Sequence, residues 1–131
     1  MSRDAAISQE TFDAIKESVR MITNLLAMGE WQAIENMTDG RRLSSDDLRS
    51  AVVEYGGTLV PIPDFELARL EIVHVSPRGL KSFRFSRSRQ MFAVAVPLWT
   101  KEEGRSDLFL ELSLSEEDGL FEIEIDNLHV S

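Results

Sequence analysis

The chain contains no cysteine among its 131 residues. That absence excludes a disulfide scaffold, a zinc site with thiolate ligands, an iron–sulfur cluster and a cysteine nucleophile. Glycine and proline are scarce, with 7 and 4 residues, which excludes a fibrous protein or a flexible linker. Hydrophobic residues make up 43% of the chain, too large a share for a disordered protein. The composition therefore indicates a folded globular chain of a length that fits one domain.

Long apolar runs are also missing. The longest runs, such as residues 25–28 and 91–96, are far shorter than the roughly 20 residues of a membrane-spanning helix. The N-terminal segment has no apolar core of the kind that a secretory signal needs. We therefore expect a cytoplasmic protein without membrane contact.

Positive charge is scarce overall, because 14 basic residues stand against 23 acidic ones and leave a net charge of −9. The charge is segregated along the chain: −6 over residues 1–71, +5 over 72–100 and −8 over 101–131. Such a chain lacks the positive field that non-specific binding to DNA or anionic membranes requires. The acidic C-terminal third instead suits a basic protein partner.

Five of the 14 basic residues lie in one stretch at 78–89, where Phe83 and Phe85 lie among arginines. Alternating aromatic and basic residues are typical of some nucleic-acid-binding surfaces. Five cations within an acidic chain make a weak electrostatic footprint, so nucleic acid is disfavoured as a partner. The alternative is that this basic ribbon pairs internally with the acidic last strands.

Helical periodicity dominates the first half of the chain. Apolar residues at spacings of 3 and 4 predict an amphipathic helix over residues 8–28, with Ser8 as its N-cap: Phe12, Ile15, Val19, Ile22 and Leu26. A second helix is predicted over 30–37, and a third begins at Ser44 or Ser45 and ends before the glycine pair 56–57. We expect residues 8–56 to be helical and residues 1–7 to be disordered.

From residue 58 onward the apolar period becomes 2. Strands are predicted at 58–60, 67–75, 90–99, 108–115 and 121–126, with a ribbon strand at 82–86 and a hairpin turn at Asp118-Gly119. Helices followed by antiparallel strands predict an α+β fold, here one domain of residues 1–131 with its sheet over 58–130. We expect a curved sheet wrapped around a long N-terminal helix, which is the cystatin-like or NTF2-like architecture.

Three strings carry a family resemblance: EYGGTLVP at 54–61, WTKEEGRSDL at 99–108 and IEIDNLHV at 123–130. With them, residues 10–130 resemble an uncharacterised bacterial domain-of-unknown-function family. The resemblance implies a small α+β protein of the bacterial cytosol. It implies no reaction, and no catalytic residues are carried over from it.

The segment 100–107 allows two interpretations. As an ordinary hairpin connection, Arg105 would pair with a carboxylate and Asp107 would bond the turn backbone. As a binding loop, Trp99, Arg105 and Asp107 would contact a partner. The turn role is favoured because every residue type in this segment has such a role.

Histidine is the residue best suited to acid–base chemistry near neutral pH. His129 follows Asp126 by three residues, so a bent strand would let Asp126 orient its ring. The chain has no spaced nucleophile motif and no metal-ligand spacing. We therefore predict no catalytic residue, no metal and no cofactor, and we keep Asp126 and His129 as candidate binding residues.

Two classes of function follow. The favoured one is a non-enzymatic protein that acts by protein–protein contact through its acidic last strands, an immunity- or inhibitor-like role being one version. A homodimer through the open sheet face is compatible by analogy alone. The alternative is an NTF2-like small-ligand binder or enzyme with a pocket between the first helix and the sheet. That pocket would draw on Trp31, Tyr55, Trp99 and His129.

Overall fold

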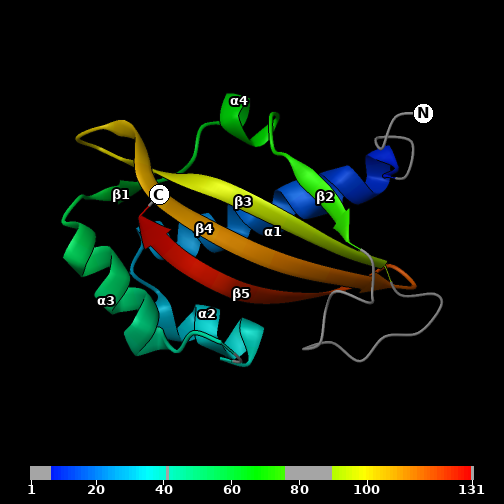
Figure 1. Cartoon of the computed structure of the whole chain (residues 1–131), viewed down its shortest axis with the longest axis horizontal. Helices are drawn as coiled ribbons and strands as arrows, with labels where there is room; N and C mark the ends of the chain where they lie inside the picture. Colours follow the sequence, from blue (N-terminus) through cyan, green and yellow to red (C-terminus); the bar gives the residue numbers. More distant parts are fainter. Residues whose placement is uncertain (1–6, 41, 76–89, 131) are drawn as a thin grey trace.

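The computed structural model describes residues 7–40, 42–75 and 90–130 (Figure 1). The helices are α1 (Gln9–Ala27), α2 (Trp31–Thr38), α3 (Ser45–Tyr55) and the short α4 (Asp64–Leu67). The strands are β1 (Leu59–Val60), β2 (Ile72–Val75), β3 (Gln90–Thr100), β4 (Gly104–Glu117) and β5 (Leu120–Val130). The predicted α+β class is confirmed, and the arrangement is compatible with a cystatin-like or NTF2-like architecture. Residues 1–6 and the expected ribbon at 82–86 lie outside the described residues.

Side-chain caps fix where two of the helices begin. The Ser8 hydroxyl accepts a hydrogen bond from the Thr11 amide at 3.1 Å and starts α1. Ser44 and Asp47 form a reciprocal capping box at the start of α3. Each cap satisfies amide groups that have no partner within the helix. Both helix starts therefore follow from local chemistry that the sequence displays.

The strands form one antiparallel sheet with β3 at its centre. On one side β3 pairs with β4 along its length, and β4 pairs in turn with the edge strand β5. On the other side, β2 pairs with the first half of β3 and β1 with its last two residues. The hairpin between β4 and β5 turns at Asp118 and Gly119, both with positive φ (55° and 80°), as predicted for this dipeptide.

The two faces of the sheet differ in chemistry. One face packs on the helices and forms the core, and in Figure 1 α1 runs behind the sheet on that side. Its sheet residues are buried and alternate along the strands: Phe92, Val94, Val96 and Leu98 on β3, and Leu108, Leu110, Leu112 and Leu114 on β4. The residues between them, among them Ala93, Ala95 and Pro97, lie on the opposite face, which we call the outer face.

The short helix α4 was not predicted, because the sequence pattern indicated a strand from Leu67 onward. The structure begins the strand at Ile72 instead. The Pro63 carbonyl accepts hydrogen bonds from the Glu66 and Leu67 amides, and the side chain of Leu67 is fully buried. Leu67 thus reaches the core as part of a helical turn, whereas the apolar alternation in the sequence predicted a strand there.

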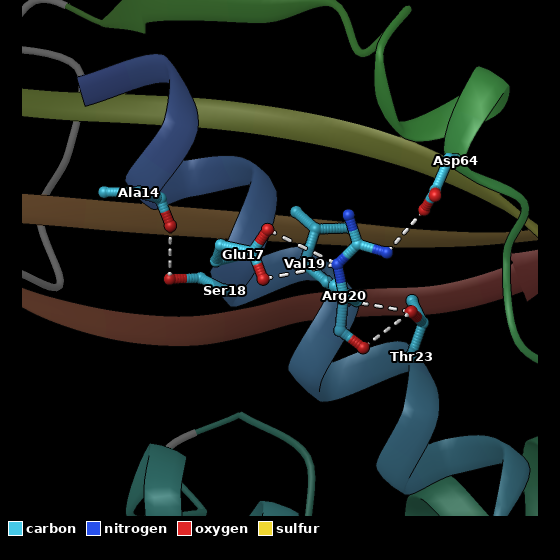
Figure 2. Close-up of polar contacts among 7 residues, drawn as sticks. All are labelled: Ala14, Glu17, Ser18, Val19, Arg20, Thr23 and Asp64. Atoms are coloured by element: carbon cyan, nitrogen blue, oxygen red, sulfur yellow. Dashed lines mark hydrogen bonds and ion pairs between the residues drawn. The ribbon is translucent and has the colours of Figure 1, made fainter. Parts of the chain in front are cut away.

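An ion pair attaches α4 to α1. The Arg20 guanidinium lies 2.5 Å from Asp64, the first residue of α4, and 3.2 Å from Glu17 on its own helix (Figure 2). These contacts raise the pKa of Arg20, chiefly through Asp64, and lower that of Asp64. The contact connects α4 to α1 on one side, and α4 also forms one wall of the site described next.

Candidate functional site: a groove on the outer face of the sheet

Two adjoining hollows form a groove on the outer face, over the middle of β3. Their volumes are about 360 and 220 Å³, and both are lined by Glu71 and Ala95. The floor is low because β3 presents small side chains there, with Ala93 under the smaller hollow and Pro97 under the larger one. We call the two hollows together the outer groove.

The smaller hollow is acidic. Carboxylates from three parts of the sheet line it: Glu71 precedes β2, Glu111 lies on β4 and Asp126 on β5. The other lining residues are apolar, and none of the described residues that line it is basic. Val73 adds an apolar side chain that is 56% exposed at this end. The hollow therefore combines an apolar floor with three carboxylates, of which Asp126 also lies 3.4 Å from Arg42 and Glu111 lies 2.6 Å from the His129 ring.

A β-bulge positions Asp126. The register pairs Glu111 with Asn127 but Leu112 with Ile125, so Asp126 is an extra residue in β5. Such an insertion redirects a side chain relative to a regular strand. The Ser113 hydroxyl donates a hydrogen bond to the Asp126 carboxylate, whose other oxygen lies 3.4 Å from Arg42. Burial raises the pKa of the Asp126 carboxyl, and the Ser113 and Arg42 contacts oppose that rise.

Glu111 holds the ring of His129. Its carboxylate oxygen lies 2.6 Å from the imidazole Nε2, whereas Asp126 interacts with Ser113 and Arg42. The expectation that Asp126 orients this ring was therefore wrong. His129 and Glu111 lie on neighbouring strands, and the Glu111 hydrogen bond raises the pKa of His129.

This pair makes a testable prediction about pH. Because its folded-state pKa is raised, the contribution of His129 to stability is fully present below the unfolded pKa and is lost as pH rises through the folded pKa. An NMR titration of the ring should give a pKa above the ordinary value, and Glu111→Gln should lower it. Glu54 and Tyr55 of α3 line a separate hollow, outside the outer groove, together with His129. Glu54→Gln therefore serves as the control and should shift the pKa of His129 less. An unchanged pKa in Glu111→Gln would contradict the pairing.

The larger hollow lies beside α4 and contains both charge signs. Glu66, only 6% exposed, forms an ion pair with Arg105 of β4. Arg69 and Glu71 line the same hollow. Trp99 is the cross-strand neighbour of Arg105, and its ring packs edge-on against Phe65 at 5.6 Å between centroids. The aromatic contact and the ion pair together fix α4 against the outer face.

A family model described as a domain of unknown function, DUF7668, matches residues 23–131. The chain is a DUF7668 protein. Neither the curated proteins nor the solved structures give a significant match to it. The matched DUF7668 region contains α4 and all five strands, so every residue that lines the outer groove lies within it.

The DUF7668 structure brings together some of the residues singled out in the sequence. Trp99 and Arg105 are neighbours, Asp126 lines the acidic hollow, and His129 contacts Glu111 beside it. Asp107 lies elsewhere, and its backbone amide donates a hydrogen bond to the Tyr55 hydroxyl at 3.1 Å. Sequence reasoning missed the acidic residues Glu66, Glu71 and Glu111. For Glu111, the one available signal was its position opposite the apolar face of β4.

Between Ile15 and Leu26, α1 is packed closely on the sheet in this DUF7668 protein. The residues of α1 that face the sheet are at most 1% exposed: Ile15, Val19, Ile22 and Leu26. A hollow of about 420 Å³ lies at the N-terminal end of α1, lined by Ile7, Ser8, Gln9, Phe12, Leu70 and Ile72. None of these six described residues is titratable. Trp31, Tyr55, Trp99 and His129 do not line that hollow.

Two features are absent from the described residues of the DUF7668 structure. No helix among them is long and apolar enough to cross a membrane. Within residues 7–40, 42–75 and 90–130, no group of three or more histidine, aspartate or glutamate side chains is arranged to hold a metal ion.

Proposed function

We propose that this DUF7668 chain is a non-enzymatic protein of the bacterial cytosol that binds a basic segment of a partner protein in the outer groove. An immunity- or inhibitor-like role is one version of this function. The observation that supports it is the convergence of Glu71, Glu111 and Asp126, from three parts of the sheet, around an alanine floor.

The acidic hollow matches the chemistry of a lysine or arginine side chain. Such side chains lay their methylene groups on apolar surface and keep the charged end in a polar setting. Here Ala93, Ala95 and Val73 offer the apolar surface, and the carboxylates surround it. A partly buried position strengthens the attraction, because the effective dielectric is lower there than in water.

A basic partner suits this surface better than a second copy of the chain. In a symmetric dimer the same patch meets itself. The carboxylates of the acidic hollow would then face one another, and like charges across an interface are unfavourable. A partner with positive charge at this point avoids that repulsion and associates faster at low salt.

The test is an NMR titration with a blocked synthetic peptide, Lys-Ala-Lys-Ala-Lys. We expect the peptide to shift the amide signals of Ala93, Ala95 and Glu111. Glu111→Gln and Asp126→Asn should each weaken binding about fivefold, the value of roughly 1 kcal/mol for one charge pair. Glu30→Gln, a matched change at an exposed position before α2, should leave the affinity unchanged.

Two results would contradict the proposal. One is a set of peptide-induced shifts confined to residues away from the outer face. The other is equal affinity of the native chain, Glu111→Gln and Asp126→Asn, because that would show that the groove carboxylates do not contact the peptide.

A further inference from the structure

The two ends of the outer groove carry different charges. The acidic hollow is lined by three carboxylates, whereas the larger hollow adds two guanidinium groups, Arg69 and Arg105. The buried Glu66 holds one side of the Arg105 group, and the Arg105 side chain remains 56% exposed. Arg69 is exposed, and within residues 7–40, 42–75 and 90–130 it forms no ion pair. Among the described residues that line the groove, the guanidinium groups thus lie beside α4; at the other end Arg42, which does not line the groove, lies 3.4 Å from Asp126.

The spacing of the two ends follows from β3. Ala95 belongs to both hollows, Ala93 to the acidic one and Pro97 to the larger one. The centres of the hollows are therefore about two residues apart along the strand. Two residues of extended chain span about 7 Å, which is also the distance between neighbouring side chains on one face of an extended peptide.

Resting on the proposed function, we infer that the outer groove binds an extended partner segment in which a basic and an acidic side chain, two residues apart, both face the sheet. The basic side chain lies among Glu71, Glu111 and Asp126. The acidic side chain lies beside Arg69 and Arg105. The partner motif is therefore a basic residue, any residue and an acidic residue, read in either chain direction.

The chemistry of the larger hollow supports an acidic side chain there. A guanidinium group binds a carboxylate through two parallel hydrogen bonds when it is held in one orientation. The ion pair with Glu66 supplies that orientation for Arg105. Pro97, Leu70 and Phe109 line the same hollow and give the peptide apolar contact. A second basic residue at this position would meet two guanidinium groups, while of the two carboxylates that line the same hollow Glu66 is already paired with Arg105 and Glu71 is shared with the acidic hollow.

Three blocked synthetic peptides of equal length test the inference, with central sequences Lys-Val-Glu, Lys-Val-Lys and Glu-Val-Glu. The measurement is an NMR titration at physiological salt, read on the amide signals of Ala93 and Ala95. We expect Lys-Val-Glu to bind the native chain about fivefold more tightly than Lys-Val-Lys, with Glu-Val-Glu the weakest. This order of affinities would show that the groove recognises both the lysine and the glutamate of the peptide.

A charge reversal sharpens the test. Arg69→Glu should invert the preference, so that Lys-Val-Lys binds this variant more tightly than Lys-Val-Glu. Arg49→Glu makes the same charge change at an exposed position on α3 and should leave the native order intact. Thermal unfolding of both variants checks that each remains folded, which we expect because both arginines are exposed.

The outcomes separate this inference from the function on which it rests. If Lys-Val-Lys binds the native chain at the groove as tightly as Lys-Val-Glu, the charge order is wrong and the basic-segment function stands. An unchanged preference in Arg69→Glu would also overturn the charge order. If neither lysine peptide shifts the groove signals, both the inference and the proposed function are refuted.

Discussion

Replacing Phe92 with alanine should lower the free energy of unfolding by about 3–5 kcal/mol. Phe92 is fully buried in the central strand, with His74 of β2 and Leu114 of β4 as its cross-strand neighbours. Its ring also lies 5.2 Å from that of His74. The variant loses the transfer free energy of the ring and gains a cavity that two paired strands and α1 prevent from closing. Urea denaturation followed by circular dichroism measures the loss.

A second phenylalanine provides the matched control. Phe65 is 56% exposed and contacts Trp99 edge to face, so Phe65→Ala should cost about 1 kcal/mol. The same side chain is removed in both variants, and the burial differs. Equal losses in the two variants would contradict the assignment of the core to the face of the sheet that packs on α1.

The elements that local patterns define were predictable from the sequence. The spacing of Ile15, Val19 and Ile22 defines the buried face of α1, and the serine caps define the starts of α1 and α3. The alternation in β3 and β4 also fixed which residues enter the core. These features depend on helix and strand periods that operate over a few residues. Physical chemistry at short range therefore accounts for most of the fold.

The site was far less predictable, because its parts come from distant segments. The sequence favoured a carboxylate partner for Arg105, and the structure supplies Glu66, which lies 39 residues away. Glu66 lies in α4, and a helix of one turn gives no clear periodic signal in the sequence. Likewise, the bulge at Asp126 depends on the register between β4 and β5, and the alternating pattern of β5 gives no sign of an inserted residue.

The acidic C-terminal third also changes meaning in the structure. Its charge of −8 suggested one acidic surface on the last two strands. Glu102 accepts hydrogen bonds from Thr58, and Glu103 accepts one from Tyr55, so both acids hold the β3–β4 hairpin against the end of α3. Some of the acidic side chains in this third therefore form hydrogen bonds that stabilise the fold. Glu111 and Asp126 reach the acidic hollow and also contact His129 and Arg42, and Glu71 joins them from outside this third.

Replacing Arg105 with alanine should cost about 2–3 kcal/mol of folding free energy, because it leaves the buried Glu66 carboxylate without its cation. A fully buried pair would cost more, but the Arg105 side chain is 56% exposed and water screens part of the interaction. The other attachment of α4, between Arg20 and Asp64, is more exposed, with the Asp64 side chain 85% accessible. Arg20→Ala should therefore cost much less folding free energy than Arg105→Ala.

A double-mutant cycle distinguishes a lost ion pair from lost packing. Glu66→Gln keeps the size of the side chain and removes its charge, so adding Arg105→Ala to it should cost much less than Arg105→Ala alone. Chemical denaturation of the four proteins gives the coupling free energy, which we expect to exceed 1 kcal/mol because one partner is buried. A coupling near zero would mean that Arg105 stabilises the chain through its contacts along β4, and α4 would then depend on Leu67 and the Phe65–Trp99 contact for its position.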